Sequence, residues 1–185
     1  SPSPKPLPPD QIRTLRLLAR RTWRFFEAFV TSGDHMLPPD GFQQDPQPVV
    51  THRTSPTNMG LYLLATVAAH DFGWLGTQSM LERLEATLAS MEKMERHRGH
   101  FFNWYDTQTL QPLEPRYVSS VDSGNLAGHL LTVAHACREG AHLATLAPTC
   151  LRGMDDALRL QREAAAGWQG AGMPRPQVQQ LGIAM

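Results

Sequence analysis

Two segments of this 185-residue chain are apolar on nearly every side of a helix, and they limit the fold more than any other feature. They are residues 58–71, NMGLYLLATVAAHD, and residues 125–138, NLAGHLLTVAHACR. A helix without a polar face must be covered by other parts of the protein. We therefore expect both segments to be buried helices inside a helical domain.

Three further segments have the apolar spacing of amphipathic helices. The first runs from Asp10, a plausible N-cap, to Gly33. The second begins at Thr77, its N-cap, and ends in the basic residues and glycine of 96–99. The third covers 149–166. Each should cover a buried helix from one side. The first helix also carries a second face that could bind anions but that we interpret as solvated; it consists of Arg13, Arg16, Arg20 and Arg24.

The segment 32–57 contains five prolines and two glycines, too many for a helix or a central strand. We predict a long ordered loop, and long loops within compact domains are often functional. Ser55 or Thr57 should cap the helix that follows, with Pro56 in its first turn. Arg53 and Asn58 add hydrogen-bonding groups there, which a ligand could use.

The predicted fold class is all-α, since no alternating stretch is longer than FFNWY at 101–105. Buried helices alternate along the chain with half-exposed ones, which is the pattern of an α/α toroid with long loops at one end. Periodicity alone does not separate this toroid from a helical bundle. The predicted divisions are a proline-rich linker at 1–9, an incomplete helical-barrel domain at 10–166 and an unassigned tail at 167–185.

Composition excludes several classes of function. The 17 basic and 17 acidic residues are scattered and give no net charge, which argues against a nucleic-acid partner. No apolar run approaches the roughly 20 residues of a membrane span. Cys137 and Cys150 match no metal spacing and are interpreted as buried thiols in a reducing compartment. His129 and His135 are six residues apart, so we predict packing roles and no metal site.

The segment 99–131 has the composition of a binding-site wall. Phe101 and Phe102 are expected in the core, whereas Trp104 and Tyr105 stand beside amide and carboxylate groups. Carbohydrate sites combine aromatic faces, which cover the apolar side of a sugar ring, with polar groups that bind its hydroxyls. Asp106, followed by Thr107 and Thr109, is the pattern of a turn.

Asp122 has two interpretations, which the sequence leaves open. It could be the N-cap of the helix at 125–138, or a carboxylate that binds a sugar hydroxyl or assists acid/base chemistry. Glycoside cleavage needs two carboxylates roughly 5 to 9.5 Å apart. No local pattern selects the pair from the available side chains, which are Asp40, Asp45, Asp106, Glu114 and Asp122.

Three long motifs resemble one protein family. They are ARRTWRFFEAFV, HRTSPTNMGLYLLATVAAHDFGWLG and RLEATLASMEKMERHRGHFFNWYDTQTLQPLEPRYVSSVDSGNLAGHLL. Over roughly residues 10–140 the chain is similar to the glucoamylase-like region of bacterial cyclic β-1,2-glucan synthases, which lies between their membrane glycosyltransferase and phosphorylase-like parts. The resemblance implies part of an (α/α)6 barrel and action on β-1,2-glucan by transglycosylation that closes a ring.

The resemblance also implies a context. This chain would be a fragment, inactive when isolated, of a synthase anchored at the cytoplasmic face of the bacterial inner membrane. It would need no cofactor, because UDP-glucose is used by the glycosyltransferase part, and its partners would be β-1,2-glucan and the other synthase domains. Within matching motifs, the substrate-binding candidates are Arg53, Asn58, Trp104, Tyr105 and Asp122, and Asp122 is the catalytic candidate. The alternatives are a non-catalytic glucan-holding module and a helical scaffold.

Overall fold

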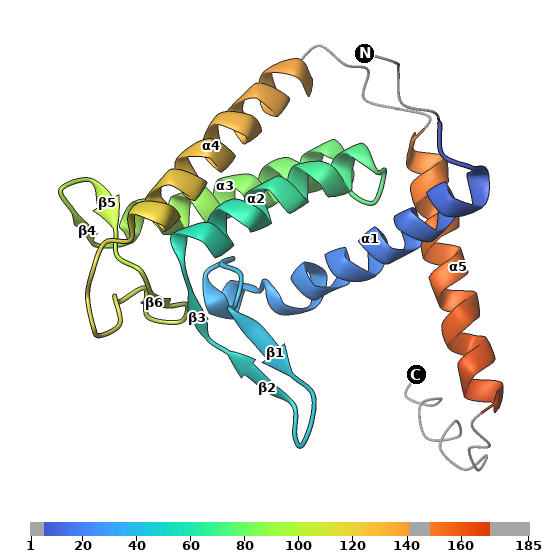
Figure 1. The fold of residues 1–185 in the computed structure, drawn as a ribbon, viewed down its shortest axis with the longest axis horizontal. Coiled ribbons are helices and arrows are strands. Elements are labelled where there is room, and N and C mark those ends of the chain that lie inside the picture. Colours follow the sequence, from blue (N-terminus) through green and yellow to red (C-terminus); the bar gives the residue numbers. More distant parts are fainter. Residues whose placement is uncertain (1–5, 141–148, 171–185) are drawn as a thin grey trace, which may run out of the picture.

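The structure is a computed structural model that describes the backbone of residues 6–140 and 149–170, and side chains as far as 166. Five helices dominate it (Figure 1): α1 (Pro9–Phe29), α2 (Pro56–Asp71), α3 (Thr77–Lys93), α4 (Ser120–Gly140) and α5 (Thr149–Gly170). A 3-10 turn, η1 (Ser32–Asp34), follows α1. The tail predicted as unassigned begins inside α5, and residues 171–185 lie outside the described part.

Short strands form three separate antiparallel pairs in the long connections. They are β1 (Gly41–Gln43) with β2 (Val49–Thr51), β3 (Arg53–Thr54) with β6 (Tyr105–Asp106), and β4 (Arg96–His97) with β5 (His100–Phe101). With only two or three residues each, these strands arrange loops and build no sheet layer. The all-α prediction is confirmed.

Helix α2 lies at the centre, packed against α1, α3 and α4. Ser55 caps it as predicted, since its Oγ accepts a 3.2 Å hydrogen bond from the Asn58 amide, and Pro56 occupies the first turn. Helices α2 and α4 run in the same direction, while α1 and α3 run the opposite way (Figure 1). Parallel inner helices joined through antiparallel outer ones are the arrangement of an (α/α)6 barrel, of which this chain forms a part.

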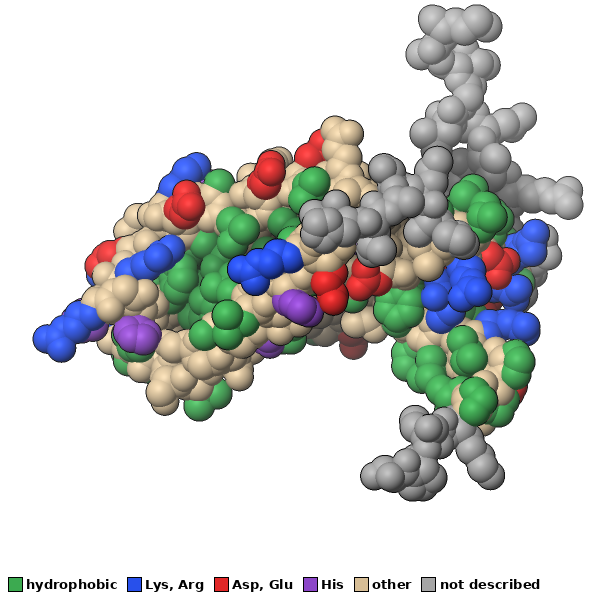
Figure 2. Space-filling view, turned by 90° about the horizontal axis from the view of Figure 1, so that it is seen from above, with side chains coloured by type: hydrophobic (Ala, Val, Ile, Leu, Met, Phe, Trp, Pro, Cys, Tyr) green, Lys and Arg blue, Asp and Glu red, His purple; other side chains and the backbone are tan. Residues whose placement is uncertain are grey.

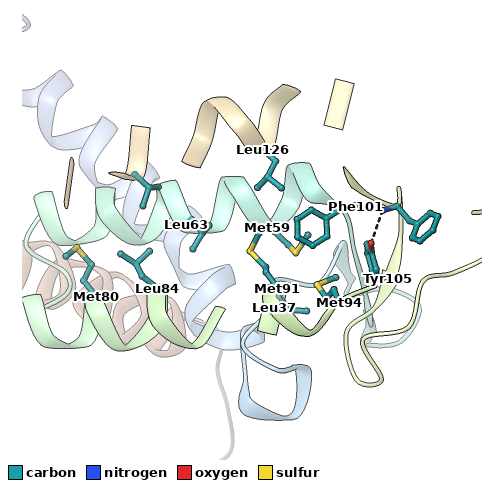
Figure 3. Close-up of a cluster of buried hydrophobic side chains, with 12 residues drawn as sticks. Leu37, Met59, Leu63, Met80, Leu84, Met91, Met94, Phe101, Tyr105 and Leu126 are labelled. Carbon is teal, nitrogen blue, oxygen red and sulfur yellow. Dashed lines mark hydrogen bonds between the residues drawn. The ribbon is translucent and has the colours of Figure 1, made fainter. Parts of the chain in front are cut away.

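The main core fills the space between α2, α3, α4 and the loops. Figure 3 shows Met59 and Leu63 of α2 between Leu126 of α4 and the α3 side chains Leu84 and Met91. A second cluster joins α1 to α2, where Trp23, Val30, Tyr62 and Ala69 are buried. Burial of α2 on nearly all sides agrees with its uniformly apolar sequence.

Close approach between α2 and α4 depends on Gly60. A β-carbon at this position would lie 2.3 Å from Nδ1 of His129, so the imidazole takes the space that a side chain would fill. His129 therefore packs between helices as predicted. The prediction for His135 is wrong, because its side chain is 71% exposed and pairs with Glu139 one turn further along α4.

Helix α5 is fastened to α1 and to the turn 72–76 by a buried carboxylate. Asp156 is 4% exposed and accepts hydrogen bonds from Arg16 Nη2 at 2.7 Å and from Trp74 Nε1 at 2.9 Å. Beside it, a β-carbon on Gly153 would lie 2.0 Å from the Gly73 carbonyl oxygen, so only glycine permits this contact. Arg16 is thus a structural side chain, and the predicted solvated arginine face is wrong at this residue.

The apolar stripe predicted for the first helix is not buried as expected. Ile12, Leu15 and Leu18 are 45%, 53% and 58% exposed and line a groove of about 670 Å³ between α1 and α2. Periodicity identified the helix correctly, but none of the described residues covers this part of it. Cys137 and Cys150 were predicted to be buried, but both are only half-buried.

The surface seen from above mixes charges of both signs, and apolar side chains are exposed between them (Figure 2). On α4, Leu126 and Val133 are buried but Leu131 is 74% exposed, so the predicted burial of this helix on nearly every side is wrong among the described residues. None of the described helices is both long enough and apolar enough to cross a membrane.

Candidate functional site

Two long connections reach the same end of the helices. Residues 30–55 lead from α1 into α2, and residues 94–119 lead from α3 into α4. Because α2 and α4 are parallel, both connections arrive at helix N-termini, where free backbone N–H groups favour negative charge. We call this side the loop end, and the opposite side, which carries the short turn 72–76, the turn end.

At the loop end, Arg53 and Trp104 stack on each other. The guanidinium carbon of Arg53 lies 4.4 Å from the centre of the Trp104 ring, a cation–π contact. Arg53 also donates from Nε and Nη2 to Oδ2 of Asp40, at 3.1 and 2.9 Å. Its side chain is 46% exposed, so the arginine is held in position and still accessible from solvent.

Asn58, in the first turn of α2, joins the same group. Its Nδ2 donates to Oδ1 of Asp40 at 3.1 Å, so Asp40 bridges Asn58 and Arg53. The β3–β6 pairing, in which Arg53 lies opposite Asp106, brings the 100–119 segment to this position. Three of the predicted substrate-binding residues are therefore neighbours: Arg53, Asn58 and Trp104.

Asp122 lies between the starts of the two inner helices. Its Oδ1 accepts a 2.5 Å hydrogen bond from Thr57 Oγ1, which also accepts a 3.2 Å bond from Nδ2 of Asn125. Asp122 is not the N-cap of α4: Ser119 Oγ accepts from the Asp122 amide at 3.1 Å and takes that role. Among the described residues none donates a hydrogen bond to Oδ2 of Asp122, which leaves this oxygen for another partner.

Tyr105 is a correction to the predicted site. Its side chain is fully buried, and its hydroxyl donates to the Glu95 carbonyl at 2.6 Å. The hydroxyl also accepts from the Phe102 amide at 2.8 Å, the dashed line in Figure 3. Burial raises the pKa of this phenol above its usual value. Tyr105 supports the loops from within the core and presents no surface to a ligand.

A further carboxylate at the loop end, Asp34, is only 5% exposed. Its Oδ1 accepts from Thr107 Oγ1 at 2.6 Å and from His52 Nδ1 at 2.7 Å, and its Oδ2 accepts from Thr31 Oγ1 at 3.2 Å. Burial alone would raise the pKa of Asp34, but the bonds from Thr107 and His52 outweigh it and hold the pKa below the usual 3.8.

Sequence reasoning missed several residues of this site. Asp40 was one of five undistinguished carboxylates, and Asp34 and Asn125 were not singled out. Asp106 forms the expected turn, accepting from the amides of Gln108 and Thr109. The only signal for Asp34 and Asp40 was their place in a long proline-rich loop, because their partners are distant in sequence.

Comparison with known proteins identifies the family of this chain. A family described as protein of unknown function (DUF3131) matches residues 17–130. The chain belongs to this family. It is also 52% identical to the cyclic β-(1,2)-glucan synthase NdvB of Rhizobium meliloti strain 1021, in an alignment of 160 positions that covers 84% of this chain. The resemblance noted from the motifs is thereby confirmed.

Two solved structures share the fold of this family member. A protein of Bacteroides fragilis NCTC 9343 described as a glucoamylase superposes with a TM-score of 0.60 at 19% identity, over 88% of this chain and 37% of that protein. The endo-β-1,2-glucanase of Chitinophaga pinensis, solved with sophorotriose and glucose, superposes with a TM-score of 0.56 at 16% identity, over 85% and 36%. The glucoamylase-like (α/α)6 fold is confirmed.

The chain spans a small part of these relatives. It corresponds to 6% of the length of the Rhizobium synthase. The comparisons therefore show the family and the fold of this chain.

Proposed function

We propose that the loop end binds a β-1,2-linked glucan and contributes to glycosyl transfer or ring closure within a cyclic β-1,2-glucan synthase. The observation that carries this proposal is the convergence of Arg53, Asn58, Trp104 and Asp122 where two parallel inner helices begin. These residues come from two connections that are distant in sequence. All four are at least partly exposed, so a ligand can reach them.

The chemistry of this group suits a sugar chain. Hydroxyl groups of a glucan can accept from Arg53 and Asn58 and donate to Asp40 and Asp122. Arg53 covers one face of Trp104, so a sugar ring would use the indole edge or its other face. Such a mixture of a few fixed polar groups and an aromatic ring is typical of carbohydrate sites.

For Asp122 we propose a charged role in the reaction. The Thr57 hydrogen bond holds Oδ1 of Asp122 in place, and the carboxylate lies at the N-terminal end of α4. An ionised carboxylate can stabilise positive charge that develops on a sugar ring, or accept the proton of an attacking hydroxyl while the new glycosidic bond forms. A second carboxylate, acting as the acid toward the leaving oxygen, would come from another part of the full-length protein.

In this proposal the full-length protein is membrane-anchored and faces the cytoplasm, and UDP-glucose is used by its separate glycosyltransferase part. A glucan-holding module is the second candidate. It is favoured by the salt bridge between Asp40 and Arg53, because each of these charges already has a partner.

Linear β-1,2-glucooligosaccharides, incubated with the full-length protein and followed by product analysis, separate these possibilities. New chain lengths or rings support the enzymatic role. Binding without turnover supports the holding module, and the absence of binding by the folded protein contradicts both.

A further inference from the structure

The buried carboxylate of Asp34 stands at the end of the only ladder that joins the two connections of the loop end within the described residues. In the β3–β6 pair, Arg53 lies opposite Asp106 and Thr54 opposite Tyr105. The residues one step beyond, His52 and Thr107, continue the ladder with a 3.1 Å bond from the Thr107 amide to the His52 carbonyl. Asp34 binds both of their side chains, one from each strand.

This ladder is too short to hold its own register. Two residue pairs form few hydrogen bonds, and isolated strand pairs are marginal even when longer. Hydrogen bonds to an ionised carboxylate are about twice as strong as those between neutral groups. The Asp34 bonds to Thr107 and His52, at 2.6 and 2.7 Å, are therefore well placed to keep β3 and β6 together.

Asp34 is itself fixed in position. The next two residues, His35 and Met36, have φ angles of 52° and 56°, a left-handed conformation that costs free energy in residues with a side chain. Helix α3 holds them there: Ser90 Oγ donates to the His35 carbonyl at 2.6 Å, and Thr87 Oγ1 donates to the Met36 carbonyl at 2.8 Å. Helix α3 thus fixes the position of Asp34, and the carboxylate of Asp34 in turn fixes β3 and β6 relative to α3.

We propose that Asp34 is a positioning residue for the glucan site, which through His52 and Thr107 keeps Arg53 stacked on Trp104. His52 directly precedes Arg53, and Thr107 follows Trp104 by three residues. A shift of either strand would separate the guanidinium from the indole ring. This inference rests on the proposed function, because the ligand of the Arg53 and Trp104 surface is taken to be a β-1,2-glucan.

The test uses the full-length protein with Asp34→Asn, which preserves the shape of the side chain and removes its charge. Asp71→Asn is the matched control, since Asp71 is 72% exposed and lies at the turn end. The dissociation constant of a linear β-1,2-glucooligosaccharide is measured by calorimetry at a temperature where every variant is fully folded. We expect Asp34→Asn to weaken binding about tenfold and Asp71→Asn to leave it unchanged.

Two further readouts separate positioning from a merely structural role. In turnover of the same oligosaccharide, Asp34→Asn should raise KM and leave kcat near the wild-type value, because Asp34 does not contact the reacting atoms. Without glucan, hydrogen exchange of the segment 103–109 should be faster in Asp34→Asn than in wild type or Asp71→Asn.

Each outcome decides the inference. If the wild type binds the oligosaccharide and Asp34→Asn binds it equally well, the positioning role is overturned, whatever the exchange rates show. If the wild type does not bind, the proposed function fails and the role toward glucan fails with it. Hydrogen exchange then still tests whether Asp34 holds β3 and β6 together. Unchanged exchange in Asp34→Asn overturns this structural role as well.

Discussion

Asp34 and Asp156 are buried to nearly the same degree, at 5% and 4% exposure, but they lie at opposite ends of the molecule. Asp156, at the turn end, binds Arg16 of α1 and Trp74 of the 72–76 turn, so its partners belong to elements that pack directly on each other. Asp34, at the loop end, binds His52 and Thr107, which lie in two long connections.

The difference lies in what each carboxylate leaves accessible. At the turn end the Arg16 side chain is only 18% exposed, and its Nε and Nη2 donate to Asp156 and to the Phe72 carbonyl. At the loop end the neighbouring Arg53 is 46% exposed. The same chemistry therefore joins helices at one end and arranges accessible polar groups at the other, which is why we propose the loop end as the functional site.

The largest effect is expected from Asp156→Ala. Removing one partner of a buried ion pair leaves the other charge uncompensated, so the free energy of unfolding should fall by about 3–5 kcal/mol. Denaturant titration measures this loss. Glucan binding by the fraction that remains folded should be unchanged, and weakened binding would contradict the division between the two ends.

Asp122→Asn should affect the reaction and leave stability almost unaltered. Ser119, and not Asp122, caps α4, and asparagine can still accept the Thr57 hydrogen bond. Loss of the charge should reduce glucan processing by about two orders of magnitude, the scale expected of acid/base or electrostatic groups. The reaction rate and the melting temperature are measured together. Near-normal activity would show that the reaction does not need the charge of Asp122.

Trp104→Ala should weaken glucan binding by about tenfold, since the loss of an aromatic contact and of its stacking on Arg53 is worth roughly 1–2 kcal/mol. The indole is half-buried, so the loss of stability should stay below the roughly 3–5 kcal/mol of a core tryptophan. Calorimetry and denaturant titration of this one variant measure both quantities. A large loss of stability with unchanged affinity would make Trp104 a core residue.

The smallest effect concerns acid stability. Asp34 has a lowered pKa in the folded protein, so its ionisation stabilises the fold above the unfolded-state pKa, and this contribution is lost as the pH falls through the folded-state pKa, below 3.8. The difference in stability between wild type and Asp34→Asn should therefore shrink as the pH is lowered from about 4 to 2. A difference independent of pH would contradict the ionised state of Asp34.

Much of the fold follows from local patterns in the sequence. Apolar periodicity located all five helices, and Ser55 with Pro56 gave the start of α2 because capping depends on neighbouring residues only. The start of α4 was placed too late, at 125, because only Asp122 was considered as its N-cap, whereas Ser119 takes that role and the helix begins at Ser120. Strands of two residues carry no alternation and were not predicted individually.

The site was predicted less completely because its contacts join distant segments. Arg53 and Trp104 were chosen for their chemistry, but their stacking depends on the β3–β6 pairing. Tyr105 was misassigned, since it is buried and its hydroxyl donates to the Glu95 carbonyl, ten residues earlier in the chain. Asp34 could not be identified, because its role depends on hydrogen bonds from His52 and Thr107, which are 18 and 73 residues away in the sequence.

Hydrogen exchange with and without a linear β-1,2-glucooligosaccharide tests most directly whether the loop end is the glucan site. In the full-length protein, glucan should slow exchange in residues 34–58 and 100–125 and leave the turn 72–76 and the contact between α1 and α5 unchanged. Protection at the turn end, or no protection in either region of the loop end when the sugar is bound, would contradict the assignment.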